Sequence, residues 1–235
     1  MINKGWFILV PILMLMLNFL LACNSFDNGI SQMNDNITVA LPQPRYDSDI
    51  SVEEAILQRR SIRDYTDEAL TLSELAQLLW AAQGITDPAG LRAAPSAGAT
   101  YPLEIYAVTG NVEDIAKGIY QYRPHQNELV KVVDGEQREA LAQAALDQQF
   151  IAQAPVNLVI TAIYERTTHR YGERGIRYVY MEAGHAAQNV YLQAVALKLG
   201  TVVVGAFYDD QVSEILKLAD NEVPLYIIPV GKIKD

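Results

Sequence analysis

Three arginines and a serine lie close together in the stretch Arg59-Arg60-Ser61-Ile62-Arg63. The planar guanidinium group forms paired hydrogen bonds with phosphate or carboxylate oxygens, and a serine hydroxyl can add another. This spacing therefore suits binding of an anion such as a phosphate group. A basic, solvent-exposed helix end has the same composition, because its charges complement the helix dipole. The stretch alone leaves both interpretations open.

A second stretch, residues 91–102, consists mainly of small residues, with Pro95, Ser96, Ala97, Gly98 and Ala99 at its centre. Backbone with so few side chains can approach a flat ligand closely and offer it N–H and C=O groups. An ordinary surface loop can have the same composition. Further along, Lys232 and Lys234 follow a predicted strand, and a solvated tail would explain them equally well.

Composition narrows the classes of function. The chain has 235 residues, of which 50% are hydrophobic and 20% charged, as expected for one globular domain. Its net charge of -10 disfavours nucleic-acid binding, which needs a basic surface. The single cysteine and three widely separated histidines match no common zinc pattern, so we expect no metal site.

Hydrophobic periodicity predicts a domain of helices and strands around these stretches. Ser51-Val52-Glu53-Glu54 and Thr71-Leu72-Ser73-Glu74 resemble capping boxes, so one helix should end just before Arg59 and another at Gly84. Further helices are predicted over residues 137–149, 175–199 and 209–218. Strands are predicted over residues 104–109, 119–122, 128–133, 156–163, 201–207 and 225–230.

The helix over residues 175–199 is the longest, and its small or apolar residues extend onto its flanks. This pattern indicates near-complete burial and suits close helix packing, including packing across a dimer interface. His185, Gln188 and Asn189 are interpreted as hydrogen-bonding anchors within it, because buried polar groups need partners.

The N-terminus has the features of an export signal. Lys4 precedes an apolar run that ends in Leu20-Leu21-Ala22-Cys23, as in a bacterial lipoprotein signal. Residues 1–22 are therefore predicted to be a signal peptide, and Cys23 the lipidated residue of a membrane-anchored, extracytoplasmic lipoprotein. A transmembrane anchor is the alternative. Residues 23–50 are predicted to be the lipidated cysteine and a flexible tether, and residues 51–235 the folded domain.

The ordered set of segments resembles the nitroreductase superfamily. RRSIRDY, LLWAAQGIT, RAAPSAGATYPLEIY, APVNLVI, YMEAGHAAQNVYLQAVALKLGTVVVGAF and PLYIIPVGK follow one another as they do in that superfamily. The resemblance covers nearly all of the chain from residue 41 to residue 234. It is closest to the branch of SagB-type dehydrogenases, which is related to the thiazole/oxazole-forming oxidases.

The resemblance implies an α+β fold, in which helices wrap a mixed, mainly antiparallel sheet, and an intertwined homodimer that binds FMN noncovalently. It implies that Arg59, Arg60 and Ser61 hold the phosphate and ribityl chain and that Arg63 faces the pyrimidine edge of the ring. Pro95, Ser96, Ala97, Gly98 and Ala99 would lie along the flavin, usually from the other subunit. Val204 and Gly205 would contact the ring, and Lys232 would lie near the phosphate.

Three functions remain open at this point. The first is an FMN-dependent oxidoreductase that acts on a small molecule or a peptide, with two-electron chemistry supplied by the flavin. The second is a membrane-anchored lipoprotein that keeps the fold as a binding or scaffold module, and the third is a flavin carrier. The resemblance assigns no catalytic base, because the chain lacks the Lys-Tyr dipeptide that the azoline oxidases use.

Overall fold

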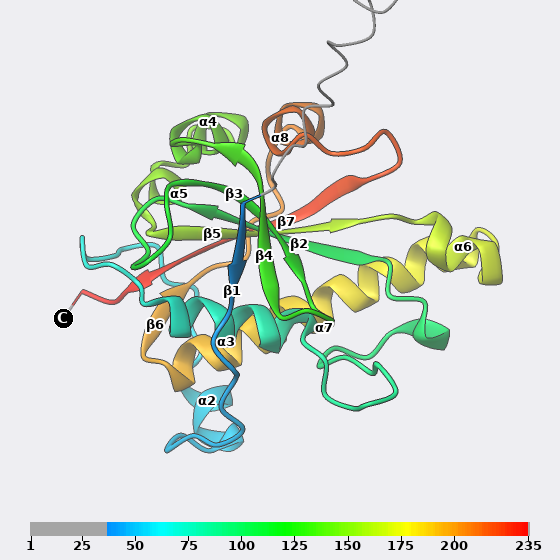
Figure 1. Ribbon diagram of the computed structural model, residues 1–235, viewed down its shortest axis with the longest axis horizontal. Helices are drawn as coiled ribbons and strands as arrows, with labels where there is room; N and C mark the ends of the chain where they lie inside the picture. The colour runs from blue at the N-terminus through cyan, green and yellow to red at the C-terminus, as the bar shows by residue number, and fades with distance from the viewer. Residues whose placement is uncertain (1–36, 235) are drawn as a thin grey trace, which may run out of the picture. The chain divides into compact units, whose positions relative to one another are not determined.

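The computed structural model describes residues 37–234 (Figure 1). The predicted signal peptide, Cys23 and the first part of the predicted tether lie outside the described residues. Within this range the chain forms one sheet with helices on both faces, so the predicted α+β class is confirmed.

The sheet has seven strands in the order β1-β4-β3-β2-β5-β7-β6. All six strand pairings are antiparallel. Among the described residues the parallel contact is a single isolated bridge between Leu70 and Val112. The strands are β1 (Thr38–Ala40), β2 (Leu103–Thr109), β3 (Gly118–Arg123), β4 (Glu128–Asp134), β5 (Val156–Ala162), β6 (Leu199–Thr201) and β7 (Val223–Lys232).

Alternating side chains of the central strands divide the interior into two cores, one on each face of the sheet. On β2, Ile105 and Ala107 pack with the helices α3 (Leu72–Gln83) and α7 (Arg174–Ala196). Tyr106 and Val108 point to the opposite core. That core is closed by α4 (Arg138–Ala144), α5 (Gln149–Gln153) and α8 (Asp209–Leu216), which lie on the other face in Figure 1.

Local capping fixes where the first helices begin. Helix α2 (Val52–Gln58) starts at Ser51, whose hydroxyl accepts a hydrogen bond from the Glu54 amide at 3.1 Å. Helix α3 starts with a complete capping box between Thr71 and Glu74 and ends at Gly84. The predicted position of Arg59, directly after the end of a helix, is therefore confirmed.

Helix α7 is the longest helix of the described chain, as predicted, but it is not buried on all sides. Its buried stripe includes Val179, Ala183 and Val190, whereas Tyr180 is 56% exposed and Met181 47% exposed. The prediction of near-complete burial is thus wrong for the single chain, because α3 and the sheet cover one side of the helix only. Asn189 is an anchor as expected, since its amide donates to the carbonyls of Ala81 and Ala93. His185 and Gln188 are exposed.

Three other predictions need correction. The helix over residues 137–149 is two helices, α4 and α5, because Leu146 and Asp147 take left-handed φ values of 61° and 59° between them. The strand over residues 201–207 ends at Thr201, after which only Val204 forms a bridge, to Ile227. The tether does not extend to residue 50: residues 38–40 form β1 on β4, because Val39 packs against the core.

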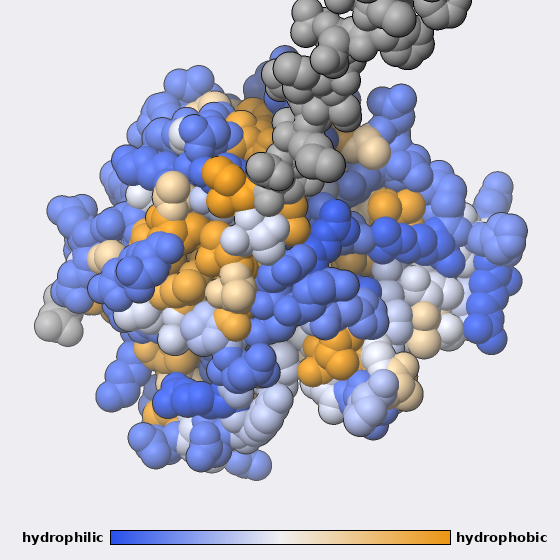
Figure 2. Space-filling view, viewed as in Figure 1, coloured by the Kyte–Doolittle hydropathy of each residue, from blue (hydrophilic) through white to orange (hydrophobic). Residues whose placement is uncertain are grey.

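Most of the surface visible in Figure 2 is hydrophilic, with separate hydrophobic areas between the hydrophilic ones. None of the described helices has the length and hydrophobicity needed to cross a bilayer.

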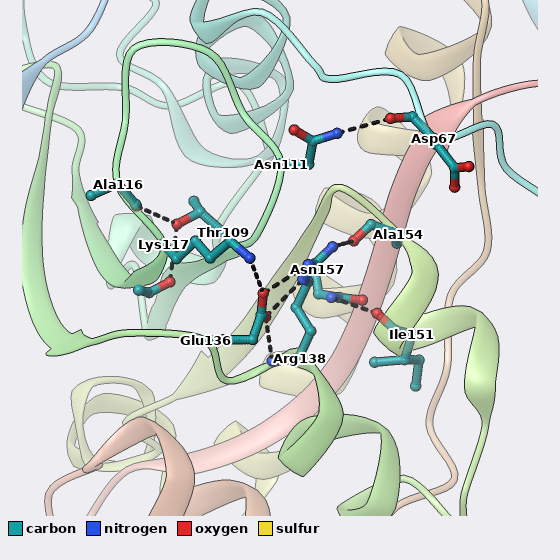
Figure 3. Close-up of polar contacts among 11 residues, drawn as sticks. Asp67, Thr109, Asn111, Ala116, Lys117, Glu136, Arg138, Ile151, Ala154 and Asn157 are labelled. Atoms are coloured by element: carbon teal, nitrogen blue, oxygen red, sulfur yellow. Dashed lines mark hydrogen bonds and ion pairs between the residues drawn. The ribbon is translucent and has the colours of Figure 1, made fainter.

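A charged clamp joins the β3–β4 hairpin to the α4–α5 region (Figure 3). The Glu136 carboxylate accepts two hydrogen bonds of 2.8 Å from Arg138 and pairs with Lys117 at 3.1 Å. Arg138 also donates to the Ala154 carbonyl at 2.9 Å and lies directly over Gly110, where a Cβ atom would be 1.8 Å from its Nε. Hydrogen bonds from Arg138 lower the pKa of Glu136 to about 2.

We predict that Glu136→Gln lowers the melting temperature at pH 7. Because the pKa of Glu136 is lowered by folding, its contribution is present above the unfolded pKa of about 4.3 and is lost as the pH falls toward 2. Melting curves recorded by circular dichroism across this range should show the two proteins converging in acid. Asp134→Asn is the matched control: its exposed pair with Lys131 should change stability much less.

Candidate functional site

The residues of the arginine cluster, Arg59, Ser61 and Arg63, occupy alternate positions of an extended segment that follows α2. Tyr191 of α7 lies under two of them. The Arg59 guanidinium is 5.1 Å from the centre of the Tyr191 ring, and the Ser61 and Tyr191 hydroxyl oxygens are 3.0 Å apart. Arg63 lies over Phe150, 5.7 Å from its ring centre.

The same segment is fixed along the β6 edge of the sheet. The Ile62 amide donates to the Thr201 carbonyl at 2.9 Å, and Tyr65 forms a bridge with Ile233. Two glycines make this close approach possible. A Cβ atom on Gly200 would be 2.7 Å from the Ile62 side chain, and one on Gly231 would be 2.8 Å from that of Tyr65.

Tyr191 also connects the arginine cluster to the chain after β6. Its hydroxyl accepts a hydrogen bond of 2.9 Å from the Val203 amide. Val204 follows, buried and paired with Ile227 through two backbone hydrogen bonds, and Gly205 is exposed. The structure thus brings the arginine cluster next to the segment that leads to Val204 and Gly205.

The four cations of the predicted site differ in their pairing. Arg59 and Arg63 form no ion pair with any residue of the described chain. Arg60 turns back and donates to the carbonyls of Leu57 and Arg59. Lys232, at the end of β7, is ion-paired with Glu74 of α3. Arg59, Arg60 and Arg63 therefore all lack a carboxylate partner in the described chain, and of the three only Arg60 is engaged by backbone carbonyls.

The other predicted group, from Pro95 to Ala99, forms a loop that contains the short helix η1 (Ala97–Ala99). Gly98 has φ 62°, and a Cβ atom there would be 2.5 Å from the Tyr171 hydroxyl and 3.0 Å from Arg170. Arg170 donates to the Gly98 carbonyl at 3.3 Å. Both neighbours belong to α6 (Glu165–Tyr171), so glycine is needed because α6 covers the loop.

A buried carboxyl group lies behind this loop. Glu182 of α7 is 3% exposed, and burial raises its pKa to about 7, although the Ser96 hydroxyl, the Ala97 amide and Arg92 favour its charged form. A cavity of about 240 Å³ lies between the loop and α7. It is lined by Pro95, Ser96, Ala97, Tyr178, Met181, Glu182 and His185.

The two groups are not brought together within one chain. Glu182 and Tyr191 are nine residues apart on α7, which corresponds to about 13 Å along the helix axis. In Figure 1 the loop and α6 lie at the beginning of α7, whereas α2 and β6 lie at its end. The arginine cluster and the loop are thus two separate parts of the predicted site that pack at different positions along α7.

Sequence reasoning missed three residues that hold these parts. Tyr191 was expected only as an apolar position of the helix over residues 175–199, and Glu182 and Tyr171 were not singled out. The sequence contains one signal for Glu182, since a carboxyl group at an otherwise apolar helix position is unusual. The roles of Tyr191 and Tyr171 depend on contacts distant in sequence and leave no local pattern.

The largest of the cavities described, of about 580 Å³, lies elsewhere, between residues 45–55, α3 and α7. It contains none of the predicted site residues. In the described part of the chain no three His, Cys, Asp or Glu side chains are grouped as they would be around a metal ion.

Residues 56–232 match the Nitroreductase family. The chain belongs to the nitroreductase family. It is 50% identical over 200 residues to a Methanocaldococcus jannaschii protein named as a nitroreductase, and the match covers 85% of this chain and 98% of that one. Nitroreductases are oxidoreductases, so the chain is an oxidoreductase.

More distant members of the nitroreductase family add detail. The microcin B17-processing protein McbC of Escherichia coli is 28% identical over 71% of this chain and 64% of its own length. The NADPH-dependent FMN reductase of Bacillus subtilis is 26% identical over 76% of this chain and 64% of its own. A crystal structure of a nitroreductase homologue from Ralstonia eutropha superimposes with a TM-score of 0.74 at 27% identity, covering 84% of this chain and 90% of that one.

We predict that Tyr191→Phe destabilises this nitroreductase-family domain by about 1 kcal/mol, because it leaves the Val203 amide and the Ser61 hydroxyl without their partner. The phenylalanine ring would still lie under Arg59. Chemical denaturation measures the change. Tyr178→Phe, which removes a hydroxyl with no hydrogen bond in the described chain, is the control and should be nearly neutral. Equal effects of both substitutions would contradict the role given to the Tyr191 hydroxyl.

Proposed function

We propose that this protein is an FMN-dependent oxidoreductase of the nitroreductase family. The observation that supports the proposal is the arginine cluster, in which Arg59 and Arg63 form no ion pair within the described chain and lie two residues before and after Ser61. Guanidinium and hydroxyl groups are the donors that a phosphate monoester requires. FMN has such a phosphate at one end and a flat ring at the other.

The residues present fit both ends of this cofactor. The arginine cluster suits the phosphate, and Arg59 lies over a ring that restricts its motion. The loop of Pro95 to Ala99 has no large side chain and could approach the ring. The flavin would supply two-electron transfer between substrates. A cation such as Arg63 beside the ring would favour the negative charge that reduction brings.

The active form would be a homodimer. The arginine cluster and the loop pack at separate positions along α7, and the resemblance to the nitroreductase superfamily implies that the loop at each flavin comes from the other subunit. Exposed apolar side chains support such an interface. They are Val52, Ile56 and Leu57 of α2 and Ile176, Tyr180 and Met181 of α7.

Within the nitroreductase family, we propose that the protein belongs to the branch of SagB-type dehydrogenases. The relative McbC is a microcin-processing protein, and a structure of the McbBCD complex with truncated pro-MccB17 bound has the same fold, with a TM-score of 0.65. A peptide is therefore one candidate substrate class, and a small molecule is the other. The FMN reductase relative supports a nicotinamide as one candidate electron donor.

We also propose that the protein is a membrane-anchored, extracytoplasmic lipoprotein. The proposal rests on the position of Cys23, the one cysteine of the chain, directly after Leu20-Leu21-Ala22. Mass spectrometry of the mature N-terminus tests it. An unmodified Cys23 in an uncleaved chain would refute it.

Retention of flavin colour and a redox assay together distinguish the oxidoreductase from a binding module and from a flavin carrier. The purified domain, incubated with FMN and dialysed, should remain yellow and should oxidise NADH or NADPH with a quinone or nitroaromatic acceptor. A colourless protein would not have retained FMN, and this result would favour the binding module over the other two functions. A yellow protein whose flavin no donor reduces would favour the carrier.

We predict that the two arginines act differently. Arg59→Ala should weaken FMN binding roughly ten- to a hundredfold, because it removes a charge-assisted contact to phosphate. Arg63→Ala should weaken binding less but lower the midpoint potential of the bound flavin, because its charge favours the reduced form. Fluorescence titration and spectroelectrochemistry measure the two effects. Arg123→Ala, on the distant β3–β4 hairpin, is the control. Small and equal effects at both positions would show that the residue assignments are wrong.

We predict that the interface contributes to flavin binding. Tyr180→Asp places a charge on the exposed face of α7 and should convert the dimer into monomers. FMN affinity should fall at least tenfold although the arginine cluster is intact. Light scattering and flavin titration check both results. Val132→Asp, at an exposed apolar position of β4, should leave the dimer unchanged. A monomeric variant with wild-type FMN affinity would contradict the shared site.

A further inference from the structure

Glu182 has no role in the function proposed so far, although it is buried at an unusual energetic cost. Its side chain belongs to α7, is 3% exposed, and has one carboxyl oxygen, Oε1, with no hydrogen-bond partner in the described chain. Burial of a carboxyl oxygen without a hydrogen-bond partner lowers the stability of the folded protein. Such a group therefore calls for an explanation, and a role in function is one.

The carboxyl group faces the loop from behind. The Ser96 hydroxyl and the Ala97 amide stabilise its charged form, and so does the charge of Arg92, which precedes the loop in the sequence. Arg92 is itself close to Glu104 of β2 and Arg166 of α6. Tyr178 and His185, on α7, line the same cavity.

The loop needs such support, because its backbone is strained. Ala99 and Tyr101 have φ values of 53° and 46°, in the left-handed region that L residues rarely adopt. Conformations of this kind persist only where the surroundings fix them. The Ser96 oxygen accepts a hydrogen bond from the Tyr101 amide at 2.9 Å, so its hydroxyl hydrogen is free to point to Glu182.

We propose that Glu182 is a positioning residue for the flavin site: its carboxylate holds Ser96 and Ala97 and thereby fixes the backbone that lies against the flavin ring. The inference rests on the proposed function. Protonation removes one acceptor and the charge, so the loop should loosen when Glu182 takes up a proton. Because burial brings the pKa to about 7, this change falls near neutral pH.

Folding stability should change in the opposite direction. The pKa of Glu182 in the folded protein is raised above the unfolded value of about 4.3. The folded state therefore binds the proton more tightly, and this contribution to stability is fully present below pH 4 and is lost as the pH rises to about 7. The ionised form of Glu182 should therefore order the loop while it lowers the folding stability of the domain.

The test compares the wild type with Glu182→Gln and with Glu222→Gln. Glu222 is the matched control, since burial also raises its pKa, but its partners are Tyr106 and Thr161 rather than the loop. FMN affinity is measured from about pH 5.5 to about pH 8.5, on both sides of the expected midpoint. Hydrogen exchange of the peptide containing residues 95–101 is measured in the cofactor-free protein over the same range.

We expect the wild type to bind FMN roughly tenfold more tightly above the midpoint than below it, as for one lost charge-assisted hydrogen bond. Glu182→Gln should show the weaker affinity at every pH, and Glu222→Gln should keep the wild-type step. In the cofactor-free protein the protection factor of the loop, which is its exchange rate relative to the intrinsic rate at the same pH, should be higher above the midpoint in the wild type but not in Glu182→Gln.

The outcomes separate the two proposals. A wild type that binds no FMN at any pH contradicts the proposed function, and the exchange of the loop still tests the role of Glu182. A Glu182→Gln variant with the wild-type pH dependence in both measurements overturns the inference. If that variant does not fold, Ser96→Ala serves instead. It removes a donor to the carboxylate and should move the midpoint upward by about one pH unit; an unchanged midpoint overturns the inference.

Discussion

The hydroxyl of Tyr191 joins three segments that are far apart in the sequence. It lies 3.0 Å from the Ser61 hydroxyl and accepts the Val203 amide, while its ring lies under Arg59. An exposed, extended segment with several arginines would otherwise have many conformations to lose when it binds an anion. Since α7 is packed against α3 and the sheet, a contact to Tyr191 fixes the arginine cluster relative to the core. Binding can then use donors that are already in place.

Both parts of the candidate site, the arginine cluster and the loop of Pro95 to Ala99, pack against helix α7. The distance between them along this helix is therefore fixed. Tyr191 orders the arginine cluster near one end of the helix, and Glu182 faces the loop nearer the other. A ligand that contacted both parts on one chain would have to span this separation of about 13 Å along the helix axis. The exposed apolar residues of α7 lie on the same helix that presents both parts. In the homodimer proposed above, a second chain packed there would bring its loop to the arginine cluster.

Much of the fold followed from local patterns in the sequence, and the failures have identifiable causes. Ser51 and Thr71 marked two helix starts, and the apolar run at β5 marked a fully buried strand. The break between α4 and α5 was missed, because Leu146 takes a left-handed conformation that leucine rarely adopts, and Asp147 follows it in the same region. In the site, the arginines and the small-residue loop could be found from composition. Tyr191, Tyr171 and Glu182 could not be assigned, because their partners are brought to them only by the fold.

The pairing of charges near the arginine cluster argues against a purely structural role for it. The chain has 28 acidic and 18 basic residues, so carboxylates are abundant. Lys232 and Lys234, at the neighbouring end of β7, are both neutralised, by Glu74 and Asp64. Arg59 and Arg63 contact aromatic rings instead, which orient a guanidinium group without neutralising its charge. A carboxylate in this place would compete with an incoming phosphate, whereas a ring leaves the positive charge available to it.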